Sequence, residues 1–207
     1  MENEFESQVA PDHYDFLRYV NKDRYMSYYY QLKYIYEIKP KTILEIGPGN
    51  NFLKNNLKDD FFIKTFDLDK KLEPDYIGDV SRISLPDNSF ELVCCFQVLE
   101  HLPFRNLEQS LEELARVSQK YVLLSLPYSR IDFKFELKLP LLKKRSMLFT
   151  IPKFYKTHVF DGQHYWEIGT KGYSKNKIIN VLRKYFIIEE INHPYENPYH
   201  IFFKLKT

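Results

Sequence analysis

The stretch that decides the fold is TILEIGPGN, residues Thr42 to Asn50. Apolar residues lead to a carboxylate at Glu45, and two glycines follow one residue apart, at Gly47 and Gly49. Glycine lets a backbone adopt positive φ and approach a ligand closely. In an open α/β sheet, ligands bind beyond the carboxyl ends of the strands. We therefore expect a buried strand whose closing loop is the floor of a binding site, with Glu45 accepting from an ammonium directly or through water.

The composition indicates one domain. The 207 residues are 44% hydrophobic and 17% aromatic, which is enough for one good core and short for two. Lys plus Arg (30) nearly balances Asp plus Glu (28), so no net field favours nucleic acid or an anionic membrane. Cys94 and Cys95 lie side by side in an apolar run and read as core thiols. Residues 1–16 lack the pattern of a signal peptide, so we expect a cytoplasmic protein. The oligomeric state stays open.

Strand and helix patterns alternate along the chain. Strands are expected at 42–46, 61–67, 90–96 and 121–126, and helices at 24–38, 106–118 and 174–185. Asn106 and Gln109 are placed like a capping box at the start of the second helix, and Ser174 opens the third. The last residues predict two strands around a turn too short for a parallel crossover. The fold class is therefore α/β: a Rossmann-like, doubly wound, mostly parallel sheet with an antiparallel last strand and helices on both faces.

Two connections depart from simple alternation. After Asp67 too few residues precede the next short strand for a helical crossover, so that helix should be missing or reduced to a turn. The segment 128–172 shows no clear period and is expected to be an inserted substrate cap. This gives a single domain with an N-terminal helical segment (1–38), a core (39–127 and 173–207) and the cap.

The N-terminal helix carries an aromatic stripe. At helical spacing, one face collects Tyr25, Tyr28, Tyr29, Leu32, Ile35 and Tyr36. We expect this stripe to pack on the edge of the sheet, with direct contact of Tyr29 to a substrate as the less favoured alternative.

A series of motifs carries a family resemblance. In order, they are ILEIGPGN, FDLD, GDVSRISLPDNSFELVCCFQVLEHLP and LEELARVSQKYVLLSLP, covering residues 41–127. The third glycine of a dinucleotide fingerprint is replaced by Phe52, which argues against a pyrophosphate site. In order and spacing the series resembles the class I S-adenosylmethionine-dependent methyltransferases, in the group often called type 11. The resemblance implies an enzyme with S-adenosyl-L-methionine as its cofactor.

The resemblance also implies cofactor-binding residues. These are Glu45, Gly47, Gly49, Asp67, Asp79, Val80, Phe96 and Gln97. Asp67, with Asp69 as its competitor, would accept from the ribose hydroxyls, and Asp79 from the adenine amino group. The alternatives are a glycine turn with a solvated glutamate and an aspartate in an ordinary turn. A third glycine common in the family is Asn51 here; asparagine tolerates the left-handed region, so the turn can form.

Fewer residues indicate where the methyl acceptor binds. His101 and His164 are candidate general bases, since an imidazole titrates near neutral pH, although His101 is equally well explained as structural. His158, Tyr165 and Trp166 lie in the polar and aromatic stretch THVFDGQHYWEIGTKGYS and are candidate substrate contacts. The spacing of histidines and acids there is not compact, so no metal is expected.

Three functional classes remain after this reading. The favoured one is methyl transfer to a small-molecule or glycan-precursor acceptor. The others are a methyltransferase acting on RNA or protein, and a methyltransferase-like binding module without turnover. No NPPY or DPPY run follows the fourth strand, which argues against the amino methyltransferases of DNA bases or protein glutamine.

Overall fold

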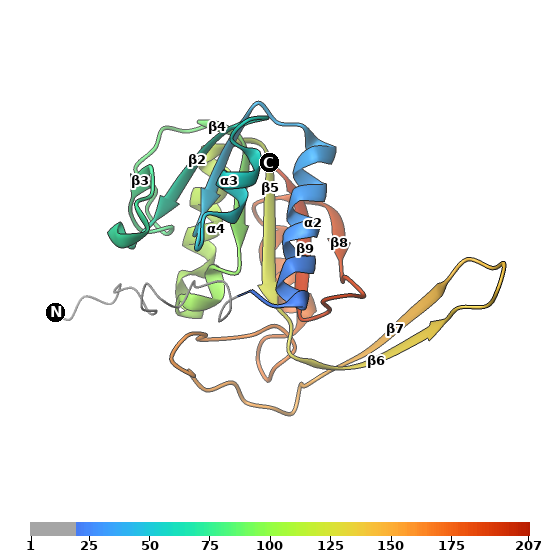
Figure 1. The fold of residues 1–207 in the computed structure, drawn as a ribbon. Coiled ribbons are helices and arrows are strands. Elements are labelled where there is room, and N and C mark those ends of the chain that lie inside the picture. Colours follow the sequence, from blue (N-terminus) through green and yellow to red (C-terminus); the bar gives the residue numbers. More distant parts are fainter. Residues whose placement is uncertain (1–19) are drawn as a thin grey trace.

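The computed structural model describes residues 20–207, and the expectations for residues 1–19 lie outside this range. Seven strands form one twisted sheet in the order β3-β2-β1-β4-β5-β9-β8 (Figure 1). Their bounds are β1 Thr42–Ile46, β2 Phe62–Asp67, β3 Tyr76–Ile77, β4 Phe90–Phe96, β5 Ser118–Pro127, β8 Ile187–Asn192 and β9 His200–Lys206. The first five are parallel, and β9 runs antiparallel to both β5 and β8. The expected fold class is confirmed.

Two hydrophobic cores lie on opposite faces of the sheet. Ile43, Leu92 and Leu123 face one core, which is closed by helices α2 (Lys22–Ile38) and α3 (Phe52–Leu57). Leu44 and Val93, their neighbours along the strands, face the other core, against α4 (Leu107–Val117) and α5 (Lys175–Leu182). The alternation of β1 puts Glu45 on the same face as Ile43, toward α2. No helix within residues 20–207 combines the length and apolarity needed to cross a bilayer.

Helix α2 buries a different face from the one predicted. Its buried residues are Ser27, Tyr28, Gln31, Tyr34 and Ile35, whereas Tyr25, Tyr29 and Tyr36 are exposed. The prediction relied on the apolar rings of the tyrosines, yet the buried face includes two polar side chains, Ser27 and Gln31. The reason is that this face borders a pocket as well as the core.

The helix starts are partly as expected. Ser174 caps α5, with its hydroxyl accepting from the backbone N–H of Lys177. The capping box at Asn106 is wrong: Asn106 has helical φ and ψ and its side chain makes no capping bond. A short 3₁₀ turn, Phe104–Asn106, leads directly into α4, so the chain is already helical there.

The missing crossover after β2 is confirmed. A single 3₁₀ turn, Lys70–Leu72, replaces it, and the Asp69 carboxylate accepts from the Lys71 N–H at its start. The chain then returns to pair β3 beside β2, where Asp67 aligns with Ile77.

The segment 128–172 contains a β-hairpin that the sequence analysis missed. Strands β6 (Arg130–Leu137) and β7 (Arg145–Pro152) pair over their full length as a separate two-stranded sheet. In Figure 1 this hairpin projects away from the main sheet. Within the predicted cap, β6 and β7 thus form this hairpin, and the chain after β7 runs back to the end of β4, where the Tyr165 N–H donates to the Glu100 carbonyl. The role of the segment as a substrate cap stays a prediction.

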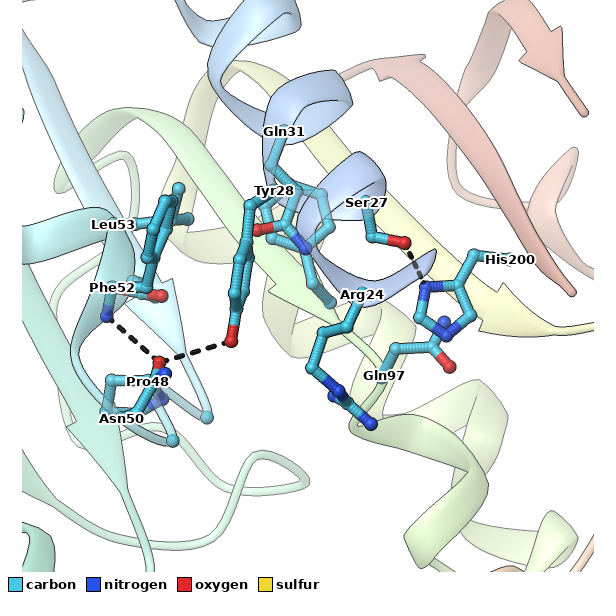
Figure 2. Close-up of a pocket in the computed structure, with 14 residues that line it drawn as sticks. Arg24, Ser27, Tyr28, Gln31, Pro48, Asn50, Phe52, Leu53, Gln97 and His200 are labelled. Atoms are coloured by element: carbon cyan, nitrogen blue, oxygen red, sulfur yellow. Dashed lines mark hydrogen bonds between the residues drawn. The ribbon is translucent and has the colours of Figure 1, made fainter. Parts of the chain in front are cut away.

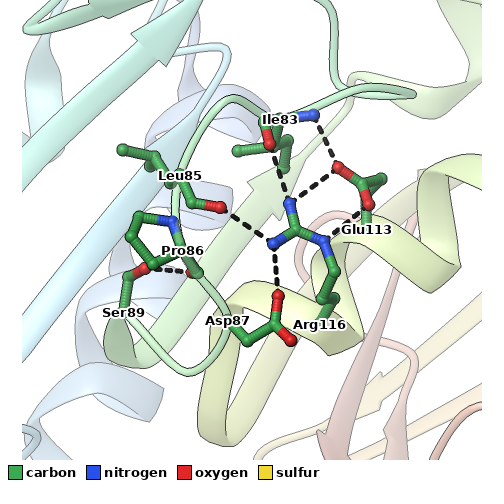
Figure 3. A network of polar contacts seen from close by, with 7 residues as sticks. All are labelled: Ile83, Leu85, Pro86, Asp87, Ser89, Glu113 and Arg116. Atoms are coloured by element: carbon green, nitrogen blue, oxygen red, sulfur yellow. Dashed lines mark hydrogen bonds and ion pairs between the residues drawn. The ribbon is translucent and has the colours of Figure 1, made fainter.

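Arg116 fixes the loop that follows Asp79 and Val80 to helix α4 (Figure 3). Its guanidinium donates to the carbonyl oxygens of Ile83 and Leu85 at 2.7 and 2.8 Å and pairs with Glu113 and Asp87 at 2.7 Å. Glu113 in turn accepts from the Ile83 N–H at 2.7 Å. One side chain thus satisfies backbone groups of a loop that has no regular secondary structure.

Candidate functional site

A pocket lies at the carboxyl edge of the sheet, between the loop after β1 and helix α2. Five of the predicted cofactor residues line it: Glu45, Gly47, Gly49, Phe96 and Gln97. Figure 2 shows Arg24, Gln97 and His200 on one side of this pocket and Asn50 and Phe52 on the other. The ring of Tyr28 stacks on Phe52 with centroids 3.9 Å apart, giving the pocket an aromatic wall.

The loop after β1 is built on left-handed residues. Gly47 has φ of 68°, and a Cβ there would lie 2.5 Å from Cγ2 of Val98, so only glycine fits. Gly49 and Asn51 have φ of 53° and 58°. Asn51 thus adopts the conformation that the sequence analysis anticipated for it. The Gly47 N–H donates to the Phe66 carbonyl at 2.9 Å, which ties the loop to the end of β2.

Glu45 is the electrostatic feature of this pocket. Its side chain is buried, and burial raises its pKa to about 8, against a smaller lowering by Lys54. Its Oε2 has no hydrogen-bond partner among residues 20–207. Arg24, from α2, lines the same pocket. An acid and a guanidinium together suit the ammonium and carboxylate of an amino-acid group.

Gln97 joins this pocket to a second polar cluster. It has φ of 57°, directly after β4. In the amide orientation that satisfies every group, its nitrogen faces Glu100 Oε1 at 3.3 Å and His200 Nε2 at 3.2 Å, and its oxygen faces Ser125. The Nδ1 of His200 lies 2.6 Å from the Ser27 hydroxyl. Burial lowers the pKa of His200 to about 3, so its ring is neutral.

Asp67, Asp79 and Val80 lie outside the lining of this pocket. Strand β2 ends at Asp67, one residue beyond Phe66, which pairs with Ile46 at the end of β1. Its carboxylate accepts from the Asp69 N–H at 2.8 Å, and burial raises its pKa. Asp79 is held by the N–H and hydroxyl of Ser81, at 2.8 and 2.9 Å. Val80 is buried in the core.

The candidate catalytic histidines meet beyond the end of β4. The rings of His101 and His164 are 5.0 Å apart, edge to face. Nδ1 of His164 lies 3.1 Å from Glu167 Oε1, which also accepts from the Tyr199 hydroxyl at 2.6 Å. Carboxylates around His164 raise its pKa although burial lowers it.

Of the candidate substrate contacts, two lie near these histidines and two do not. His158 Nε2 lies 2.9 Å from the backbone oxygen of His164, and Tyr165 stacks on Phe160 at 4.4 Å. Trp166 is fully buried, packs against Phe104 and donates to the Leu102 carbonyl, so it belongs to the core. Tyr29 is 54% exposed on the outer face of α2 and does not line the pocket.

Sequence reasoning missed several residues of the site. Arg24, Gln31 and His200 line the pocket, and Glu100, Glu167 and Tyr199 surround the histidines. One signal was available: positions 24, 27, 28 and 31 follow helical spacing and define the face that borders the pocket. Nothing in the sequence brings residues 199 and 200 to positions 97–101, because that depends on the antiparallel register of β9.

Comparison with known proteins finds a family match over part of the sheet. Residues 44–124 match the family model described as "Methyltransferase domain". No curated protein sequence matches the chain.

Solved structures share the fold at low identity. A protein from Pyrococcus horikoshii OT3 has a TM-score of 0.63 at 13% identity, with 96% of each chain covered. An S-adenosylmethionine-dependent methyltransferase from Clostridium acetobutylicum ATCC 824 has 0.60 at 10%, covering 94% of this chain and 95% of that one. The N-methyltransferase NodS from Bradyrhizobium japonicum WM9, in complex with S-adenosyl-L-homocysteine, has 0.57 at 10%, covering 88% and 86%.

The buried Glu45 should make the stability of the fold depend on pH. Because the pKa of Glu45 is near 8 in the folded chain and near 4.5 when unfolded, the folded state binds the extra proton between these values. The contribution of Glu45 to stability therefore falls as pH rises from about 4.5 to 8. We expect Glu45→Gln to raise the melting temperature by an amount that grows over this interval and levels off above pH 8.

Thermal unfolding between pH 5 and 9 measures this effect without any ligand. Glu112→Gln, on the exposed face of α4, is the matched control. If the difference in melting temperature between Glu45→Gln and the parent stays constant with pH, the Glu45 carboxylate is charged throughout this range and the expectation is wrong.

Proposed function

We propose that this chain, a class I S-adenosylmethionine-dependent methyltransferase, methylates a small-molecule or glycan-precursor acceptor. The observation that carries the proposal is the polar cluster of His101, His164 and Glu167, which adjoins the cofactor pocket through Glu100 and Gln97. Such a cluster offers several directed polar groups within a small, half-buried space, which suits a compact acceptor.

The residues of the pocket fit this cofactor. The unpartnered oxygen of buried Glu45 suits its ammonium, and Arg24 suits its carboxylate. We assign Asp67, at the end of β2, to the ribose hydroxyls and Asp79 to the adenine amino group. When bound, the cofactor supplies a methyl group on a positively charged sulfur. The protein's part is to hold donor and acceptor in line and away from water.

We assign the acceptor to the region where residues 153–172 meet η3, the 3₁₀ turn Leu99–His101. The Tyr165 N–H donates to the Glu100 carbonyl at 2.8 Å, so this stretch lies directly against the turn that follows β4. We assign the acceptor chemistry to His101 and His164, with His158 and Tyr165 as contacts that select the acceptor. Trp166 supports the stretch from the core and is not assigned a contact.

One solved structure of the same fold supports a glycan-bearing acceptor. It is a glycopeptide N-methyltransferase in complex with S-adenosyl-L-homocysteine. The binding-module alternative rested on Asn51 and on the shortened connection after β2. Asn51 keeps the left-handed turn, and Asp67 still closes β2, so neither feature disrupts the pocket edge.

Acceptor selection and cofactor binding should separate by mutation. We expect His158→Ala and Tyr165→Ala to lower methyl transfer at least tenfold, while affinity for S-adenosylhomocysteine stays within about threefold of the parent. Transfer of labelled methyl from S-adenosylmethionine to pooled small-molecule and glycan acceptors measures the first, and calorimetric titration the second.

Trp166→Ala is the contrasting variant. Because the Trp166 ring is fully buried, this substitution should lower the free energy of unfolding by about 3–5 kcal/mol.

Labelling of RNA or protein, with no labelled small molecule or glycan in the pools, would contradict the proposed acceptor class.

A further inference from the structure

Three side chains that are candidate metal ligands converge beside the cofactor pocket. One ligand atom from each of Glu100, His101 and His164 lies within 4.8 Å of those from the other two. Glu100 is fully buried, and its Oε2 has no hydrogen-bond partner among residues 20–207. A buried, unpartnered carboxylate oxygen costs free energy unless a cation or donor meets it.

The two histidines are oriented by neighbouring acceptors. Nδ1 of His101 lies 3.0 Å from the carbonyl oxygen of Gln163, and Nδ1 of His164 lies 3.1 Å from Glu167. A proton on each Nδ1 leaves Nε2 as the coordinating atom. Metal-ligating histidines almost always donate their other ring N–H to a carboxylate or a backbone carbonyl. Both kinds of partner are present here.

The backbone holds the three residues together although His164 is 63 positions from His101. Glu100 and His101 lie in η3, directly after β4. The Tyr165 N–H donates to the Glu100 carbonyl at 2.8 Å, next to the contact between His101 and Gln163. In a tetrahedral site with bonds of about 2.1 Å, ligand atoms are roughly 3.4 Å apart. Because the three atoms lie within 4.8 Å of one another, a cation requires the side chains to move together by at most about 1.4 Å.

We propose that Glu100, His101 and His164 form a site for one divalent cation. Two imidazoles and one carboxylate favour a borderline ion such as Zn²⁺ or Mn²⁺ over Mg²⁺ or Ca²⁺, which prefer all-oxygen sites. Three protein ligands leave a coordination position open, as in catalytic rather than structural sites. This assignment replaces the sequence-based expectation of no metal.

The site deepens the proposed function, on which this step rests. Glu100 Oε1 faces the amide nitrogen of Gln97, and Gln97 lines the cofactor pocket. A cation there would hold an acceptor through an oxygen close to the methyl donor and lower the pKa of a coordinated hydroxyl. The acceptor class is thereby narrowed to molecules that present a hydroxyl.

Direct titration tests the site without any methyl transfer. Calorimetry of the untagged chain with ZnCl₂, MnCl₂ and MgCl₂ should show one Zn²⁺ or Mn²⁺ per chain with a dissociation constant below 100 µM, and weaker Mg²⁺ binding. Glu100→Gln and His164→Gln should each weaken binding at least 100-fold. Glu167→Gln, which removes only the carboxylate behind His164, should weaken it roughly 10–100-fold.

His193→Gln is the matched control, because His193 is a half-buried histidine held by Arg130 at 2.6 Å, apart from the three residues. It should bind the cation like the parent. If Glu100→Gln fails to fold, the His164→Gln titration decides alone.

No binding by the parent at 100 µM, or undiminished binding by the ligand variants, overturns the site. S-adenosylhomocysteine binding is measured on the same samples. Its loss alone would overturn the proposed function and leave the metal site standing.

The β6–β7 hairpin carries an independent feature. One of its faces consists of the opposed apolar pairs Ile131–Ile151, Phe133–Phe149 and Phe135–Met147, all at least 40% exposed. At its tip, Leu139, Leu141 and Leu142 are also exposed, Leu141 completely. An isolated two-stranded ribbon is marginally stable in water, and an apolar face of this extent marks an interaction surface.

We infer that the hairpin docks on an anionic lipid surface. Lys138, Lys143, Lys144 and Arg145 flank the apolar tip, and Glu136 is the only acid between residues 136 and 145. Apolar side chains that enter the headgroup region next to basic side chains at its surface are the pattern of interfacial binding. A second copy stacked tip to tip would instead bring like charges together. This inference differs from the sequence-based expectation of no membrane partner.

Vesicle co-sedimentation tests the docking. The chain should sediment with vesicles of 30% phosphatidylserine in phosphatidylcholine, and much less with phosphatidylcholine alone. Leu141→Asp with Leu142→Asp should reduce the bound fraction at least fivefold, whereas Ile187→Asp, at an exposed apolar position on β8, should not. Absence of sedimentation, or a dimer in light scattering that the tip variant dissolves, overturns the inference.

Discussion

The site depends on one close approach, that of the loop after β1 to the end of β4. Gly47 has no room for a side chain because Val98 occupies the space where a Cβ would lie. This contact sets the loop carrying Gly49 beside Gln97, and the bond from Gly47 to Phe66 adds the end of β2. Three strand ends are thereby fixed at one edge of the sheet. The pocket lies at this edge, and the polar cluster adjoins it through Gln97 and Glu100.

Two buried acids at this edge oppose folding. Burial raises the pKa of Glu45 to about 8 and that of Glu100 to about 7, and each has a carboxylate oxygen without a partner among the described residues. Glu45 lines the same pocket as Gln97, and Glu100, beside the histidines, faces the amide nitrogen of Gln97. Unsatisfied groups of this kind in a native structure point to binding partners. The ammonium of a zwitterionic cofactor would pair with Glu45, and a bound cation would pair with Glu100.

The sequence predicted the parts of the fold that rest on local chemistry. Strands β1 and β4 have the expected bounds, because each is a mostly apolar run that ends where the backbone turns left-handed. Ser174 was predictable as a cap from its hydroxyl alone. The left-handed turn after β1 was predictable because glycine at a crowded, positive-φ position leaves few alternatives.

What was missed depends on long-range packing. Ser27 and Gln31 are buried because α2 borders a pocket. There the Ser27 hydroxyl contacts the ring of His200, at the start of β9. Composition cannot decide that Trp166 fills the core while Tyr165 stays half-buried next to it. The convergence of His101 and His164 requires the path of the chain through β5 and the hairpin. The stretch IDFKFEL alternates in the way that β6 requires, but its apolar side chains are at least 40% exposed, so burial did not single it out as a strand.

The most direct test of the account is calorimetric titration of S-adenosylhomocysteine into the parent, Asp67→Asn and Asp69→Asn. If β2 ends at Asp67 and its carboxylate holds the ribose, Asp67→Asn should lose about 1.5–3 kcal/mol of binding free energy. Asp69, which caps the 3₁₀ turn, should be replaceable with less than a threefold change in affinity. No binding by the parent, or a loss confined to Asp69→Asn, would contradict the account.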